Sequence, residues 1–222
     1  MTRIFFKGHV ELRLVATVLA AVALTAASDI DAQVTSRSAF TTAPTKVLPT
    51  IPQSTRLDML DYFDGGSAKL MTNALDGPAK IETLEDQLIE LTTGSSSRMA
   101  LAVLPSGKKE IIMVVSQLAT PAIDSYIKFY NSRWDELDAD KLFSEPSLDD
   151  WVGKLKGDER VDAENIFPFI TYKADYQPST KTLTLTPTVK ELLPEETRER
   201  GMKMLARSLT YQWNGKQFKL VK

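Results

Sequence analysis

The sequence contains no cysteine and only one histidine among its 222 residues. Without cysteine the chain can form no disulfide, and it has neither a catalytic thiol nor a cysteine that could carry a lipid. A hydrophobic core therefore has to hold the fold together. The single histidine, His9, lies near the N-terminus, within a segment whose composition sets it apart from the rest of the chain.

That N-terminal segment has the pattern of a signal peptide. Three basic residues precede a run without any charge over residues 14–27, and small residues follow the run. The run is shorter than the roughly 20 apolar residues that a helix needs to cross a bilayer, which favours cleavage over a membrane anchor or a buried core helix. Cleavage after Ala27 and cleavage after Ala32 both fit. We predict the later site and a signal peptide over residues 1–32.

Removal of residues 1–32 would take His9 away and leave a chain with neither cysteine nor histidine. This excludes Ser-His-Asp and Cys-His catalysis, and zinc sites built from nitrogen or sulfur ligands. The formal charge stays at −2, because three basic and three acidic residues leave together. So small a net charge argues against binding to nucleic acid. No later segment reaches membrane-spanning length without charges, so we expect a periplasmic or extracellular protein with no membrane span after cleavage.

The remaining chain divides into three parts. Residues 33–53 are rich in Ser, Thr and Pro without an apolar period, and we predict a flexible linker. Residues 54–145 begin with a helix from Thr55 to the Gly65-Gly66 stop, followed by a second short helix over residues 67–75. Short β-branched and aromatic runs separated by turn residues then predict an antiparallel meander. The four expected strands cover residues 87–92, 98–104, 110–117 and 125–130.

Residues 146–222 repeat the succession of helix and strands. Helices are expected over residues 148–155 and 194–204, and strands over residues 167–176 and 182–189. Asn214-Gly215 stands between two alternating apolar runs, which is a strong hairpin signal. The predicted fold class is α+β, with antiparallel sheets in two halves that each combine helix with a four-stranded meander.

Three strings resemble a known family. They are Arg-Leu-Asp-Met-Leu-Asp-Tyr at residues 56–62, Asp-Ser-Tyr-Ile-Lys-Phe-Tyr at residues 124–130 with Trp134, and Tyr-Gln-Trp-Asn-Gly-Lys at residues 211–216. From Ser54 to its end the chain is similar to a family of uncharacterised exported proteins of Bacteroidetes-type bacteria, domain of unknown function 3256. The resemblance implies an α+β fold and a location in the envelope or outside the cell. It implies no reaction and no catalytic residues.

Aromatic residues supply the candidate binding surface. Tyr126, Tyr130, Trp134 and Tyr211 could form a flat platform for a glycan or a peptide, because rings offer large contact areas. The competing interpretation places about half of them in the core, since alternate side chains of a strand point to opposite faces. Joint exposure of Tyr126 and Tyr130 would distinguish the two.

Acidic residues supply the candidate metal site. Asp58, Asp61 and Asp64 lie three residues apart on the first expected helix and could offer oxygens to Ca²⁺. Calcium loops, however, draw their ligands from a non-helical loop. We therefore interpret these carboxylates as a solvated helix face and predict no metal and no cofactor.

Two serine-lysine pairs and one turn with a glycine followed by three serines complete the candidates. Ser125 and Lys128 would form a catalytic dyad on a helix, but on the expected strand they point to opposite faces. Ser106 and Lys109 share the spacing within a hairpin turn. Residues 94–98 look like an anion-binding nest, but no helix follows them, which favours an ordinary turn.

These observations favour a non-catalytic binding or interaction protein of the cell envelope or the outside. Its partner would be an envelope protein, a peptide or a glycan, and not nucleic acid. The alternative is a hydrolase that cleaves an envelope polymer with two carboxylates and so needs neither histidine nor cysteine. Its acids would come from Asp58, Asp61 and Asp124, although spacing in the sequence does not select among them.

Overall fold

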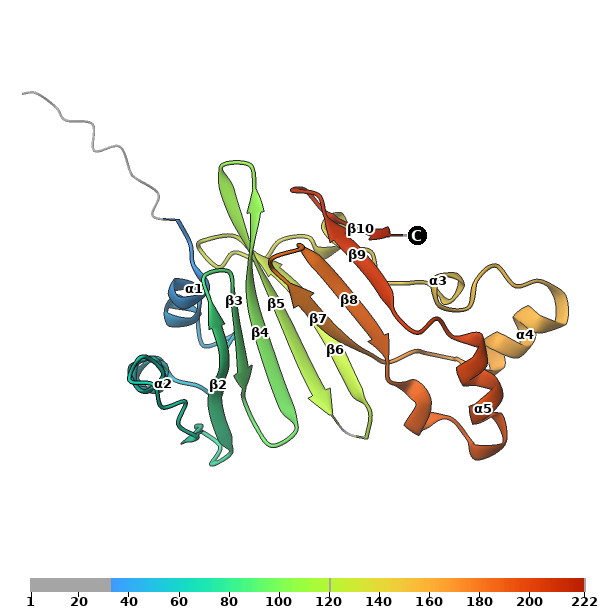
Figure 1. Ribbon diagram of the computed structural model, residues 1–222, viewed down its shortest axis with the longest axis horizontal. Coiled ribbons are helices and arrows are strands. Elements are labelled where there is room, and N and C mark those ends of the chain that lie inside the picture. The colour runs from blue at the N-terminus through green and yellow to red at the C-terminus, as the bar shows by residue number, and fades with distance from the viewer. Residues whose placement is uncertain (1–32, 120, 222) are drawn as a thin grey trace, which may run out of the picture. The chain divides into compact units, whose positions relative to one another are not determined.

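A computed structural model of the chain describes residues 33–119 and 121–221. The predicted signal peptide, both of its cleavage sites and His9 lie outside the described residues. Two antiparallel sheets and several helices make up the fold (Figure 1). The α+β class predicted from the sequence is therefore confirmed.

The larger sheet has six strands, and each pairs with its neighbours in the chain, in the order β1-β2-β3-β4-β5-β6. The β4–β5 hairpin is the longest pair, and its two-residue turn places Gly107 at a φ of 65°, which glycine adopts without strain. The strands are β1 (Met71–Thr72), β2 (Pro78–Glu85), β3 (Leu88–Thr92), β4 (Ser97–Ser106), β5 (Lys109–Ala119) and β6 (Ile123–Tyr130).

The smaller sheet has four strands in the order β10-β9-β8-β7, which leaves β7 at one edge. Its strands are β7 (Tyr172–Gln177), β8 (Thr182–Pro187), β9 (Leu209–Trp213) and β10 (Phe218–Val221). The Asn214-Gly215 signal does mark a hairpin: Trp213 pairs with Phe218 across the turn between β9 and β10.

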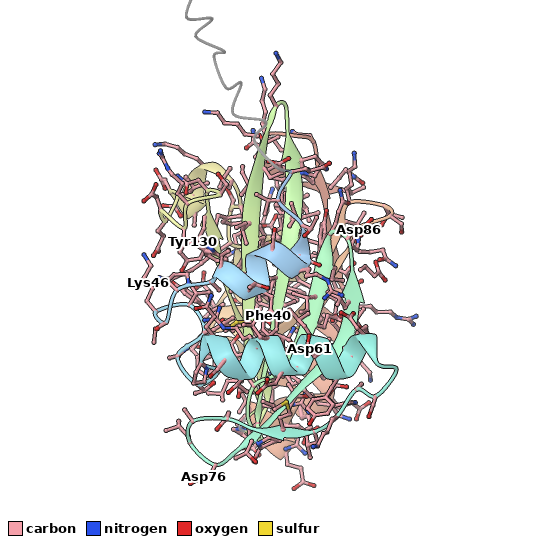
Figure 2. The ribbon with its side chains drawn as sticks, turned by 90° about the vertical axis from the view of Figure 1, so that its left-hand side faces the viewer. Phe40, Lys46, Asp61, Asp76, Asp86 and Tyr130 are labelled. Carbon is pink, nitrogen blue, oxygen red and sulfur yellow. The ribbon has the colours of Figure 1, made fainter. Side chains whose placement is uncertain are left out.

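Both faces of the six-stranded sheet are buried. Helices α1 (Ser36–Thr42) and α2 (Gln53–Asp64) cross one face (Figure 2), and their apolar side chains form a core with residues of β2 to β6. The other face shares a second core with the four-stranded sheet and with α3 (Leu148–Val152), α4 (Gly157–Ile166) and α5 (Glu195–Met204). Two short 3-10 helices, η1 (Ala139–Lys141) and η2 (Val189–Leu192), lie in the connections. The predicted boundary near residue 145 separates the sheets along the chain, but one core joins them.

The segment over residues 33–53 is folded, and the linker predicted there is wrong. Thr35 caps α1 in a capping box with Ser38, and Phe40 is 0% exposed beneath the helix. Leu48 and Ile51 are buried in the same core. These apolar residues are irregularly spaced because α1 is short and a turn follows it, so the segment shows no helical period.

The helix predicted over residues 67–75 is also absent. Asn73 accepts hydrogen bonds from the backbone N–H groups of Leu75 (2.8 Å) and Gly77 (2.9 Å), and its amide donates to the carbonyl of Thr93 (2.8 Å). Such bonds from a side chain to nearby backbone stabilise a turn in place of a helix. The turn leads into β2, so the first sheet contains β1 and β2 in addition to the four strands that were expected.

Candidate functional site

The four aromatic residues predicted to bind a ligand do not share a surface. Tyr126 on β6 is 61% exposed, whereas Tyr130, Trp134 and Tyr211 are buried. Tyr130 and Trp134 belong to the core beneath α1 and α2, and Tyr211 belongs to the core between the sheets. Tyr126 and Tyr130 are not exposed together, so the geometry does not support an aromatic platform.

Trp134 has a structural task in its own core. Its φ of 64° is unusual for a residue other than glycine, and its ring lies 5.4 Å from that of Tyr130. The indole N–H donates to the hydroxyl of Thr42 at 3.2 Å. These contacts fasten the end of α1 to the loop that follows β6.

The three aspartates of α2 lie on its exposed surface. Asp64 forms an ion pair with Arg37 at 2.6 Å, and this guanidinium lowers the pKa of the carboxyl. Asp58 and Asp61 are exposed. Within residues 33–119 and 121–221, no three acidic, histidine or cysteine side chains lie close enough together to hold a metal ion.

The serine-lysine pairs are engaged in other contacts. Ser125 is buried and accepts a hydrogen bond from the N–H of Ala174 on β7 at 2.9 Å. Lys128 pairs instead with Glu136 at 2.9 Å. Ser106 donates to the carbonyl of Gly215 at 2.9 Å. The two serine hydroxyls thus help to join the two sheets. Ser125 and Lys128 have separate partners, as expected for residues that point to opposite faces of a strand.

The Gly-Ser-Ser-Ser-Arg segment at residues 94–98 forms part of the turn between β3 and β4 and the first two residues of β4. Its basic residue, Arg98, donates to the carbonyls of Gly94 (3.2 Å) and Ser97 (3.0 Å). The guanidinium is thus bonded to the turn itself, which supports the interpretation as an ordinary turn.

A pocket that the sequence did not indicate lies between α3, the segment that joins α4 to β7, and the start of β7. Its volume is about 200 Å³. It is lined by Glu145, Pro146, Leu148, Trp151, Phe167, Pro168, Phe169, Ile170 and Tyr172. We call it the Glu145 pocket. Apolar walls with one acidic group are the usual composition of a ligand site.

Helix α3 and strand β7 position two of the pocket's rings. Ser147 and Asp150 form a capping box that starts α3, and one turn of helix then directs Trp151 into the core. Tyr172 is the first residue of β7, whose alternation turns Tyr172 and Ala174 to the same buried face. The rings of Trp151 and Tyr172 lie 6.3 Å apart with planes at 33°.

Two phenylalanines of the segment after α4 have opposite environments. Phe167 is buried, whereas Phe169 is 61% exposed. Helix α5 supports Phe167 through Gly201, where an added Cβ would lie only 3.1 Å from the Phe167 ring. Phe169 thus presents an apolar ring to solvent, two residues after Phe167, which packs closely against Gly201 of α5.

The polar part of the pocket is a hydrogen-bonded pair. The hydroxyl of Tyr172 donates to the carboxylate of Glu145 at 2.5 Å. Burial raises the pKa of Glu145, the Tyr172 bond opposes that rise, and the charge of Asp124 adds to it. Burial above all, and then Glu145, raise the pKa of Tyr172 far beyond its usual range. Tyr172 is therefore a neutral donor at any physiological pH.

A second hollow, of about 230 Å³, lies between β7 and the β3–β4–β5 region and is lined by charged side chains. Three of its five charged residues are already paired within the protein: Glu82 bonds Lys80 at 2.6 Å, and Lys173 bonds Asp175 at 2.7 Å. The Glu145 pocket is the stronger candidate because its carboxylate bonds a neutral phenol and no cation lines its walls.

Two antiparallel sheets with helices on both sides define an α+β protein. The family described as "Protein of unknown function (DUF3256)" matches residues 27–218, and the chain belongs to that family. The resemblance to domain of unknown function 3256 seen in the sequence is therefore confirmed, and the export that this resemblance implied stays a prediction.

A solved structure has the same fold. It is a domain of an uncharacterized protein from Porphyromonas gingivalis W83, similar with a TM-score of 0.71 at 20% sequence identity. The likeness covers 83% of this chain and 96% of that one. At this identity it shows the fold alone. No curated protein matches the chain.

The described part of the chain contains no helix that is both long enough and apolar enough to cross a membrane.

Proposed function

We propose that the protein is a non-catalytic binding protein of the cell envelope or the extracellular space, and that its ligand occupies the Glu145 pocket. The observation that carries this proposal is the combination of apolar walls with one bonded carboxylate. The walls offer contact area, and the carboxylate offers directional recognition. The basic and apolar pattern of residues 1–32 supports the location.

The exposure of Phe169 supports a role in binding. Because Phe169 is 61% exposed, most of its apolar surface stays in contact with water in the folded chain, and a ligand seated in the pocket would cover it. Since Phe167 and Trp151 are buried beside it, the ligand would meet a prearranged wall and would order few protein side chains on binding.

Retention of ligands from native envelope extract tests the proposal. The purified protein is immobilised, exposed to extract and washed, and the retained molecules are identified by mass spectrometry. Phe169→Ala should lose a molecule that the wild type retains. Tyr126→Ala is a matched control, because Tyr126 is also 61% exposed but lies on β6. Identical retention by wild type and Phe169→Ala would contradict a function at this pocket.

One observation favours the hydrolase as a second candidate. The charge of Asp124 contributes to the raised pKa of Glu145, so the two carboxylates act on one another electrostatically, and a hydrolase without histidine requires a pair of carboxylates. Asp58 and Asp61 lie on the exposed surface of α2 and border no such pocket. Release of products from purified envelope polysaccharide or peptidoglycan by the wild type, abolished in Glu145→Gln and in Asp124→Asn, would establish catalysis. If the wild type binds the polymer but releases no product, the hydrolase is contradicted and the proposed binding function stands.

A further inference from the structure

We propose that the Glu145 pocket recognises an ammonium group, either primary or carrying methyl groups. This inference rests on the proposed binding function and names the chemistry of its ligand. It follows from the charge of the pocket, the nature of its walls and its size.

The charge of the pocket selects cations. Glu145 is the one charged residue among those that line it, and the negative charge of Asp124 also acts on Glu145. The hydroxyl of Tyr172 donates one hydrogen bond, of 2.5 Å, to the carboxylate of Glu145 and so uses part of its capacity to accept hydrogen bonds. A carboxylate has about four acceptor positions, so others remain for a ligand N–H or for contact with a methylated ammonium. An anionic ligand would meet a like charge and no basic side chain among the residues that line the pocket.

The walls favour an organic cation over a hydrated metal ion. Aromatic faces attract a cation that lies within about 6 Å of the ring centre. The ring centres of Trp151 and Tyr172 are 6.3 Å apart, so one ammonium group could lie within that range of both. Phe169 supplies a third ring at the exposed side.

No lysine is among the residues that line the Glu145 pocket, so no lysine of the protein takes the place of the proposed ammonium ligand between the rings. The lysine–tyrosine contacts found in the described residues lie at Tyr62, Tyr126 and Tyr130, at 4.5 to 5.9 Å from the ring centres. None of these tyrosines borders the Glu145 pocket.

The size of the pocket favours a head group or the end of a side chain. Its volume of about 200 Å³ is below the roughly 300 Å³ at which pockets for whole drug-sized ligands begin. A lysine side chain of a peptide and a free quaternary amine would both present the required group. The experiment has an arm for each source.

Titrations followed by NMR of the indole N–H signals test the inference on the full protein. Choline is compared with its uncharged isostere 3,3-dimethylbutan-1-ol, and acetyl-lysine methylamide with acetyl-norleucine methylamide. The Trp151 signal, assigned through Trp151→Phe, should shift with at least one of the charged ligands. That ligand should bind about tenfold more tightly than its neutral partner. The arm that binds identifies the source.

Variants locate the effect. Glu145→Gln keeps the shape of the side chain and should weaken binding of the ammonium ligand about tenfold, Phe169→Ala should weaken it several-fold, and Tyr126→Ala should leave it unchanged. Thermal unfolding of each variant verifies that it is folded. Equal affinity for charged and neutral partners, or no shift of Trp151 with either ammonium ligand, would overturn the inference. If the extract experiment still retains a Phe169-dependent neutral ligand, the binding function stands and only its ligand class is wrong.

Discussion

The hydroxyl of Tyr172 donates a 2.5 Å hydrogen bond to the carboxylate of Glu145, and the two residues are 27 positions apart in the chain. The bond ties the first residue of β7 to the loop that precedes α3. Because Tyr172 is held in the core, the bond fixes the direction of a carboxylate at the pocket wall. The pair therefore couples the ionisation of Glu145 to the stability of the fold.

Glu145→Gln should change how stability depends on pH. The pKa of Glu145 is raised above its ordinary value of 4.5, chiefly by burial. As pH rises, Glu145 loses its proton in the unfolded chain before it does so in the folded protein. The wild type therefore loses stability from about pH 4.5 until the pH exceeds the raised pKa of Glu145 in the folded protein. The free energy of unfolding of Glu145→Gln minus that of wild type should therefore increase with pH across this window. Urea unfolding at a series of pH values measures it.

Tyr172→Phe serves as the companion variant in that series. The Tyr172 bond lowers the pKa of Glu145, so its loss should raise this pKa further and extend the pH-dependent decline to higher pH. A pH-independent difference between Glu145→Gln and wild type would show that the pKa of Glu145 is not raised. A difference that falls with pH would show that the tyrosine bond outweighs burial.

Gly201→Ala should destabilise the protein although alanine is the better helix former. The substitution gains about 1 kcal/mol of helix propensity. The new Cβ would lie 2.9 Å from Ile166 and 3.1 Å from the ring of Phe167, closer than packed atoms allow. Overpacking of this kind costs about 1–3 kcal/mol, so a net loss of about 1 kcal/mol is expected in urea unfolding.

The control for this variant lies on the same helix. Lys203 pairs with Glu199 at 2.6 Å, and both side chains are largely exposed. Lys203→Ala should change the free energy of unfolding by less than about 0.5 kcal/mol. A gain of stability in Gly201→Ala would show that α5 can move away from Phe167 at little cost.

The strands that could be predicted from the sequence carry their own local signals. Strands β4, β5 and β6 are rich in apolar, β-branched or aromatic residues and have turn residues between them, and Asn214-Gly215 marks the hairpin of β9 and β10. Strand β2 was missed because it buries only Ala79 and Ile81, which is too few for a visible alternation. Where the local pattern is weak, pairing with β3 decides the structure.

The aromatic platform failed for a reason that lies elsewhere in the chain. Alternation shows which side chains share a face of a sheet, but not whether something covers that face. Tyr130 and Trp134 lie in the core beneath α1. Helix α1 itself belongs to the segment that was predicted to be a linker. Because residues 33–53 were predicted to be a linker, no helix was expected over Tyr130 and Trp134, and the two rings were candidates for an exposed binding surface.

The Glu145 pocket has no local signal of its own. Glu145 precedes α3, Phe169 follows α4, and Tyr172 begins β7. Only the packing of these elements brings a carboxylate against a phenol and several rings. The clustering of Trp151, Phe167, Phe169 and Tyr172 within a short stretch was visible, but core packing would produce the same composition.

Phe40→Ala tests whether residues 33–53 belong to the folded unit. Phe40 is fully buried between α1 and the six-stranded sheet. Its truncation should lower the free energy of unfolding by about 3–5 kcal/mol. Leu57→Ala on α2 removes a similar apolar side chain that is 46% exposed, and it should cost less than about 1 kcal/mol. Equal effects of the two would mean that α1 does not pack on the sheet in solution.

Arg56→Met tests how the two N-terminal helices are held together. The guanidinium of Arg56 is buried, and its Nη1 donates to the carbonyls of Phe40 (2.8 Å), Thr41 (3.2 Å) and Ala43 (2.7 Å) at the end of α1. Burial lowers the pKa of Arg56 from its ordinary value, but the group stays charged at neutral pH. A cation beside these carbonyls also offsets the negative end of the α1 dipole.

Methionine preserves much of the bulk of Arg56 but leaves the carbonyls without their donor. We expect a loss of about 2–4 kcal/mol in urea unfolding, because buried acceptors lose a charged partner. Arg37→Met is the matched control: Arg37 bonds Asp64 at 2.6 Å, but both side chains are exposed, so its loss should cost less than about 1 kcal/mol. Arg56→Lys should lie between the two, since an ammonium can serve some of the carbonyls but not all three from one position. Equal losses for Arg56→Met and Arg37→Met would show that packing alone, and not the buried guanidinium, joins α1 to α2.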